Sequence, residues 1–159
     1  MPSRDIHRPV GMVAGGAYAG IRAQRRYRRR PQATAPIVAE TIGGNAGGWL
    51  GGALPDWIDP PTSPNHRNYG HGIATVAGAV AWTADALLAL QQKLRAQADK
   101  LLNERWQLQS DAARALSIAA EFALRFLAGL LDGLIAGYAS HLVMDFCTPS
   151  SLPLVARGL

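Results

Sequence analysis

The pattern of apolar and polar positions predicts helices along most of the chain. Segments 9–29 and 36–53 are rich in small apolar residues, 73–102 begins apolar and becomes amphipathic, and 111–146 is apolar over its second half. Apolar residues do not alternate with polar ones, so strands are not predicted. With 159 residues, the length of one ordinary domain, we expect residues 1–159 to form a single compact all-α helical bundle.

Glycine recurs at four-residue spacing in the first two predicted helices. Each glycine inside a helix costs about 1 kcal/mol relative to alanine, so this pattern indicates helix backbones in close contact. That contact could lie inside one core or join two copies of the chain as a homo-oligomer. The spaced pairs and triplets are Gly11 and Gly15, Gly16 and Gly20, Gly43, Gly47 and Gly51, and Gly44, Gly48 and Gly52.

The segments between the predicted helices are marked by proline and polar residues. Residues 54–72 contain Pro55 and three further prolines, which predict a loop. Residues 103–111 are polar and should hold a turn, with Ser110 as the N-cap of the next helix. In 73–102 we expect Leu90, Leu94 and Leu101 to form a stripe beside polar residues such as Gln91 and Arg95.

The last predicted helix is long enough to span a bilayer, which requires about 20 apolar residues. Its apolar half is interrupted by Arg125, Asp132, His141 and Asp145. Charged groups in such a helix need partners, either inside a protein core or along a polar inner face of a membrane span. We favour burial within the protein.

The net charge of +5 comes from one short run. Six arginines lie between Arg22 and Arg30, and the rest of the chain holds ten basic and eleven acidic residues. Such a run could bind an anionic membrane surface or, less favoured, nucleic acid. The run could equally be the solvated C-terminal end of a helix, where the helix dipole stabilises positive charges.

The candidate chemistry lies where histidines and carboxylates occur together. His141 and Asp145 are one helical turn apart, and Asp56 and Asp59 precede two more histidines, His66 and His71. Imidazole and carboxylate ligands together suit zinc, manganese or iron better than calcium or magnesium. A hydrogen-bonded His–Asp pair inside the core is the alternative. The single cysteine, Cys147, excludes a disulfide framework, fits a reducing, cytosolic compartment and is expected to be a small buried residue.

These windows also carry a family pattern. The residues that carry it are Leu54-Pro55-Asp56, Asp59-Pro60, Pro64-Asn65-His66-Arg67, His71, Gly137-Tyr138-Ala139-Ser140-His141, Asp145, Thr148-Pro149 and Leu152-Pro153-Leu154. With these motifs, residues 43–75 and 130–155 resemble a family of predicted metal-dependent hydrolases described as LexA-binding and inner-membrane-associated, the YdjM-like family. His7, followed by Arg8 and Pro9, fits the family's early histidine.

The resemblance implies a divalent metal, with zinc favoured and manganese or iron as alternatives. The implied ligands are Asp56, His66, His71, His141 and Asp145, with His7 as a further member. It also implies a cytoplasmic or inner-membrane-associated protein, not a secreted one.

The function expected from these ligands is hydrolysis of a small-molecule or lipid phosphoester by a metal-activated water. Asp59 is our candidate for the proton acceptor, and Arg67 for the group that neutralises an anionic substrate. The alternative is a non-enzymatic protein, membrane-peripheral or part of an assembly, whose metal site is structural or vestigial. In that case the arginine run would bind anionic lipid or nucleic acid.

Overall fold

The computed structural model describes residues 4–30, 33–58 and 73–147. These residues form α1 (Arg4–Tyr27), α2 (Thr34–Ile58), α3 (Ile73–Glu104), the short 3₁₀ helix η1 (Arg105–Gln107) and α4 (Asp111–Phe146), with no strand among them. The predicted all-α bundle is confirmed.

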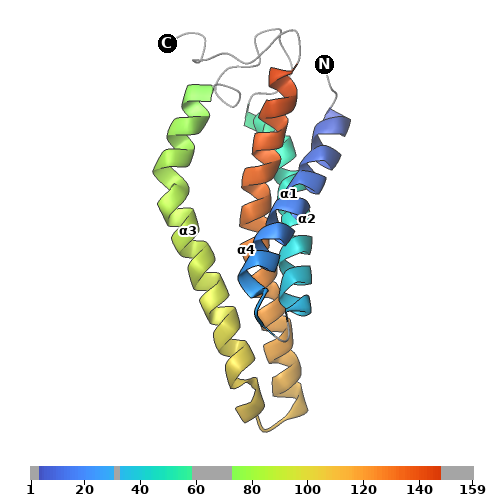
Figure 1. Ribbon diagram of the computed structural model, residues 1–159, viewed down its shortest axis with the longest axis vertical. Coiled ribbons are helices and arrows are strands. Elements are labelled where there is room, and N and C mark those ends of the chain that lie inside the picture. The colour runs from blue at the N-terminus through green and yellow to red at the C-terminus, as the bar shows by residue number, and fades with distance from the viewer. Residues whose placement is uncertain (1–3, 31–32, 59–72, 148–159) are drawn as a thin grey trace.

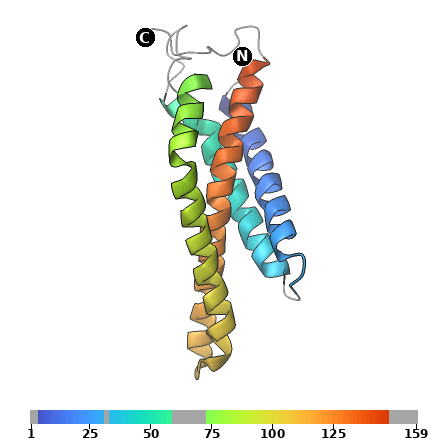
Figure 2. The same ribbon diagram turned by 60° about the vertical axis from the view of Figure 1, so that its left-hand side comes forward.

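The four helices form two antiparallel hairpins of unequal length. The hairpin of α3 and α4 extends well beyond the hairpin of α1 and α2 (Figure 1). Helix α4 lies between α3 and the α1–α2 pair and contacts all three (Figure 2). In the described part of the chain, the backbone of α3 runs close only to α4 and η1. Its links to α2 and to Arg30, which follows α1, are made by side chains.

Glycine allows α2 to touch both of its neighbours. A Cβ at Gly47 would lie 2.0 Å from the carbonyl oxygen of Leu130 on α4, and one at Gly48 would lie 2.1 Å from that of Gly11 on α1. Real side chains do not approach a backbone oxygen so closely, so both positions require glycine. The predicted close backbone contact is confirmed, and these ladders join helices of one chain.

Two helices extend further than the positions of the prolines led us to predict. Helix α1 begins at Arg4 and includes Pro9, and α2 continues through Pro55 to Ile58, so the predicted loop begins later than residue 54. A proline inside a helix loses one backbone hydrogen bond and crowds the preceding turn. Pro55 is fully buried, and its packing offsets part of that cost. His7 and Asp56 therefore lie on helices.

Helix α4 begins as predicted. The Ser110 side chain accepts a hydrogen bond from the backbone N–H of Ala113 at 3.2 Å. This bond satisfies one of the donors left open at a helix N-terminus and confirms Ser110 as the N-cap.

Helix α3 covers its leucine stripe only in part. Leu90 is 45% exposed and Leu94 and Leu101 are half-buried, whereas Gln91, Arg95 and Ala98 are buried. The polar residues are buried because the face of α3 turned to the other helices meets charged groups, described below. Cys147 was also predicted to be buried, but it is exposed just after the end of α4.

The interior combines small apolar residues with large polar ones. The charged residues that interrupt α4 are buried, as favoured above: Arg125 is 1% exposed and Asp132 is fully buried. No helix among the described residues is both long and apolar enough to cross a membrane. The largest fully buried side chains are Arg125, Tyr27, His141, Gln91, Glu40, Asp132 and Pro55.

Candidate metal centre

Three helices bring two histidines and two carboxylates together. His7 comes from the early part of α1, Asp56 from the end of α2, and His141 and Asp145 from the end of α4. All four are buried, between 0% and 8% exposed. We refer to these four residues as the metal centre. Within it, His7, His141 and Asp145 each offer a ligand atom, and these atoms lie within 4.8 Å of one another, so the group could hold a metal ion.

Gly52 is the backbone position around which the centre is built. A Cβ there would lie 2.6 Å from the carbonyl oxygen of His7, so only glycine lets α1 approach this closely. The Gly52 carbonyl oxygen lies 2.7 Å from Nδ1 of His141. Because a carbonyl can only accept, Nδ1 carries the proton and donates it. In neutral His141, Nε2 is then the ring nitrogen that carries a lone pair, as a metal ligand requires.

The atoms facing this lone pair are carboxylate oxygens. Nε2 of His141 lies 3.5 Å from an Asp145 oxygen and 3.7 Å from an Asp56 oxygen. Nε2 of His7 lies 3.7 Å from the other Asp145 oxygen. Bonds of about 2.1 Å at tetrahedral angles would place neighbouring ligand atoms about 3.4 Å apart. The observed separations are close to this value, so the residues lie near enough to one another to share one ion.

The two imidazoles lie on one another. The ring centroids of His7 and His141 are 3.8 Å apart with an angle of 18° between the planes. Two stacked rings that were both protonated would repel each other in this buried position. The arrangement therefore disfavours a positive charge on both rings at once.

The surroundings of His141 favour a cation. Burial alone would lower the pKa of its imidazole, but the hydrogen bond with Asp145, the Gly52 carbonyl and the charges of Asp56 and Asp145 outweigh burial and raise it. The same carboxylates that stabilise a proton on His141 would stabilise a divalent ion in its place, since metal and proton compete for the lone pair.

Four of the six predicted ligands meet in this centre: Asp56, His141, Asp145 and His7. His7 had been the least specific part of the sequence pattern, and its helical position explains how it reaches the others. The two remaining predicted ligands, His66 and His71, and the two predicted catalytic residues, Asp59 and Arg67, lie outside the described residues.

Comparisons of the chain with protein families, with characterised proteins and with solved structures find no match. The resemblance to the YdjM-like family stays a prediction, and the centre is judged on its own geometry.

A second buried polar cluster was missed by the sequence analysis. Glu40 of α2 and Asp132 of α4 are fully buried, and Arg95 of α3 binds both, with Nη2 at 3.0 Å from Glu40 and 2.8 Å from Asp132. Arg26 donates to Glu40 at 2.9 Å and Arg22 to Asp132 at 2.5 Å. We call these five residues the charged core.

Arg125 of α4 extends this cluster to Glu121, Tyr27 and Asp99, on the side away from the metal centre. Its guanidinium donates to Glu121 at 2.8 Å, to the Tyr27 hydroxyl at 2.7 Å and to Asp99 at 2.9 Å. The Tyr27 hydroxyl in turn donates to Glu40 at 2.6 Å. Burial, together with the bond to Glu40, raises the pKa of Tyr27 to about 12, so this hydroxyl stays a donor.

The arginine run is thus divided between two roles. Arg22, Arg26 and Arg30 recur every four residues, and each binds a carboxylate, Arg30 doing so through two bonds to Asp99 at 2.8 and 2.9 Å. The remaining arginines of the run, Arg25, Arg28 and Arg29, are exposed. The four-residue spacing, together with isolated charges inside the apolar helices, was the sequence signal for this core.

Proposed function

We propose that this protein is a metal-dependent hydrolase whose ion is held by His7, His141 and Asp145, with Asp56 beside them. The observation that carries the proposal is that buried His7, His141 and Asp145 offer ligand atoms within 4.8 Å of one another, with an Asp56 oxygen 3.7 Å from Nε2 of His141. The donor set of nitrogen and oxygen favours zinc, with manganese or iron as alternatives.

The residues of the centre have distinct tasks in this proposal. Gly52 holds the His141 ring through Nδ1, which sets the tautomer and the direction of Nε2. Asp145 faces both imidazoles, with one carboxylate oxygen near Nε2 of His7 and the other near Nε2 of His141, and supplies negative charge to both. A divalent ion, when bound, supplies Lewis acidity and makes a coordinated water easier to deprotonate.

The proposed substrate class is a phosphoester, either a small molecule or a lipid. Asp59 follows Asp56 by three residues, directly after α2 ends at Ile58. We assign it the role of accepting a proton from the attacking water. Arg67, a few residues further along, is assigned to the phosphoryl charge, because a guanidinium matches phosphate with two parallel hydrogen bonds.

Metal content by elemental analysis tests the first half of this proposal. Untagged wild type, His141→Ala and Ser140→Ala are purified side by side; Ser140 is the neighbouring residue, and its hydroxyl bonds only locally, to the Gly137 carbonyl. We expect about one equivalent of transition metal in wild type and Ser140→Ala, and none in His141→Ala. Folded wild type that stays metal-free after incubation with zinc and with manganese contradicts the proposal.

Activity on bis(4-nitrophenyl) phosphate and 4-nitrophenyl phosphate tests the second half. The zinc-loaded wild type should hydrolyse one of them, and Asp59→Asn should lose that activity while retaining the metal. An acyl ester, 4-nitrophenyl acetate, is tested alongside them. Metal binding without hydrolysis of any of the three esters would favour the second candidate below.

The second candidate is a non-enzymatic protein that binds an anionic membrane surface and has a structural metal. It is supported by a continuous exposed stripe on α1, in which apolar residues are followed by arginines. Val13 is 65% exposed and Ile21 is 51% exposed, and Arg25 and Arg28 continue the same helical face. Binding to anionic but not neutral vesicles, lost in Arg25→Gln/Arg28→Gln, is the expected result for this candidate.

A further inference from the structure

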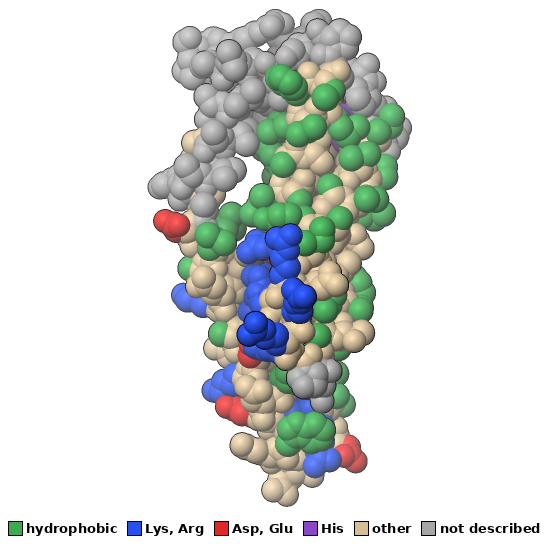
Figure 3. All heavy atoms as spheres, in the orientation of Figure 1, with side chains coloured by type: hydrophobic (Ala, Val, Ile, Leu, Met, Phe, Trp, Pro, Cys, Tyr) green, Lys and Arg blue, Asp and Glu red, His purple; other side chains and the backbone are tan. Residues whose placement is uncertain are grey.

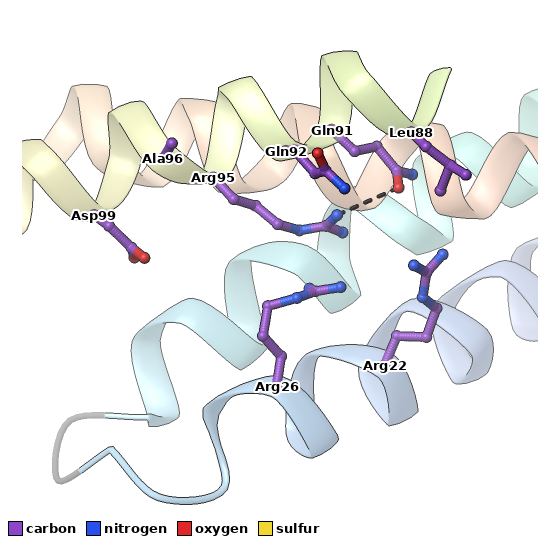
Figure 4. Close-up of a pocket in the computed structure, with 8 residues that line it drawn as sticks. All are labelled: Arg22, Arg26, Leu88, Gln91, Gln92, Arg95, Ala96 and Asp99. Carbon is purple, nitrogen blue, oxygen red and sulfur yellow. Dashed lines mark hydrogen bonds between the residues drawn. The ribbon is translucent and has the colours of Figure 1, made fainter. Parts of the chain in front are cut away.

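A cleft about 370 Å³ in volume opens between α1 and α3, above the charged core. Figure 4 shows guanidinium and amide groups from both helices directed into it. The surface view shows Lys and Arg side chains gathered in the middle of one face of the molecule (Figure 3). The lining residues are Arg22, Arg26, Leu88, Gln91, Gln92, Arg95, Ala96 and Asp99.

The cleft has more arginine than its buried carboxylates require. Arg95 alone hydrogen-bonds both Glu40 and Asp132. Arg22 and Arg26 then add a second guanidinium to each carboxylate. Three cations thus meet two buried anions, which leaves one positive charge in excess at the floor of the cleft.

The two arginines of α1 also have hydrogen-bonding capacity directed to the solvent side. Each binds its carboxylate through one terminal nitrogen, Nη1, although a guanidinium has five N–H donors. Their side chains are 30% and 29% exposed, whereas Glu40 and Asp132 beneath them are fully buried. Figure 4 shows the guanidinium groups of Arg22 and Arg26 extending toward Gln91 and Arg95 across the cleft.

One carboxylate lines the cleft, and its charge is already matched. Asp99 accepts two hydrogen bonds from Arg30 and one from Arg125. Burial alone would raise the pKa of Asp99, but the bonds to these two arginines lower it overall, so the group stays ionised and paired. A second hollow of about 560 Å³, lined by Arg25, Arg26, Arg28 and Arg29, adjoins the cleft through Arg26 and adds positive charge.

We propose that this cleft binds a small organic phosphate at a site separate from the metal centre. Arginine forks are matched to phosphate oxygens. The volume lies within the range of small-molecule pockets, about 300 to 1,000 Å³, which leaves room for an organic part against Gln92, Leu88 and Ala96. Asp132, at the floor, precedes His141 by nine residues on α4, or about 14 Å along the helix axis.

The test is a titration of metal-free protein with glycerol 3-phosphate, and separately with inorganic phosphate, monitored by calorimetry and by the thermal unfolding midpoint. Sodium chloride at matched ionic strength is the control for screening. The principal variant is Gln92→Glu, which places a negative charge in the cleft without removing any partner of Glu40 or Asp132. Gln97→Glu makes the same change at an exposed position of α3 that does not line the cleft.

We expect saturable binding of glycerol 3-phosphate to wild type and Gln97→Glu, and about tenfold weaker binding to Gln92→Glu, because the added carboxylate repels the ligand at close range. Inorganic phosphate should bind the same site more weakly, since it lacks the organic part. Absence of saturable binding to wild type, or equal weakening in the two variants, overturns the proposal. Because the protein is metal-free throughout, this result is independent of the proposed hydrolase activity.

Discussion

The metal centre and the charged core are both buried polar clusters in one bundle, but their carboxylates are neutralised differently. Glu40 and Asp132 each lie against two guanidinium groups at hydrogen-bond distance. Asp56 and Asp145 face imidazole nitrogens at 3.5 to 3.7 Å. Arginine is a permanent cation, whereas the positive charge between histidines and carboxylates can be a proton or a metal.

This difference has a consequence for stability. The carboxylates of the charged core are paired with arginines of the same chain, so the contribution of this core to the free energy of unfolding should change little with pH or metal supply. The stability of the metal centre should depend on pH and on metal supply, because a cation held there, whether a proton or a metal, can exchange with solution.

The largest effect is expected in the charged core. Glu40→Ala leaves Arg95 and Arg26 without their shared carboxylate, and breaking a buried ion pair from one side costs about 3–5 kcal/mol. Urea unfolding of the metal-free protein measures the change. Glu104→Ala removes one partner of an exposed pair with Lys100 at 4.0 Å and should cost under about 0.5 kcal/mol. Equal costs for the two variants would mean that the core pairs contribute little.

A smaller loss of stability is expected at Gly52, where the metal centre depends on close contact between the backbones of α1 and α2. Gly52→Ala places a methyl group against the His7 carbonyl and should force α1 and α2 apart at a cost of about 1–3 kcal/mol. The same variant should bind zinc more weakly, because His7 moves away from His141. Gly78→Ala on α3 is the control, since a Cβ there meets nothing within 4 Å and should be neutral or stabilising. Unchanged zinc affinity in Gly52→Ala would place His7 outside the ligand set.

The stabilisation of the fold by zinc should depend on pH, because zinc and a proton compete for the imidazole of His141. Its pKa is raised in the folded state, so its protonation stabilises the metal-free protein below the unfolded pKa of about 6.5, and this contribution is lost as pH rises through the folded pKa. Zinc should therefore raise the unfolding midpoint more at about pH 8 than at about pH 6. Unfolding scans with and without chelator measure this. A larger zinc effect at the lower pH contradicts the assignment.

The smallest effect concerns the surface. Arg28 is exposed at the basic end of α1, and Arg28→Gln should change the free energy of unfolding by less than about 0.5 kcal/mol. Arg22→Gln, in the same run, removes a partner of buried Asp132 and should cost several times more. Similar losses in both variants would contradict the division of the run into inward and outward arginines.

Local patterns predicted the helices, the Ser110 cap, the glycine contacts and the pairing of His141 with Asp145. These depend on residues a turn or less apart, or on a repeat within one helix. The proline rule failed at Pro55 because tertiary packing outweighed a local cost. The convergence of Glu40 with Arg95 could not be predicted, since it depends on how helices distant in sequence are placed together.

Half of the proposed site follows from local spacing alone, whereas His7 and Asp56 were implied as ligands by the family resemblance. His141 and Asp145 share one helical face, so their partnership follows from spacing alone. His7 lies on another helix and reaches them only because glycines bring α1 against α2. Asp56 became a member because α2 continues past Pro55 and brings it to the end of α4.

The central claim is that the metal centre holds an exchangeable cation through imidazole nitrogen and carboxylate oxygen. X-ray absorption spectroscopy of the zinc-loaded protein tests it most directly. We predict a short nitrogen and oxygen shell at about 2.0–2.1 Å with the outer-shell scattering of imidazole, weakened in His7→Ala and lost in His141→Ala. A zinc shell without imidazole scattering, or one unchanged in both variants, would contradict the account.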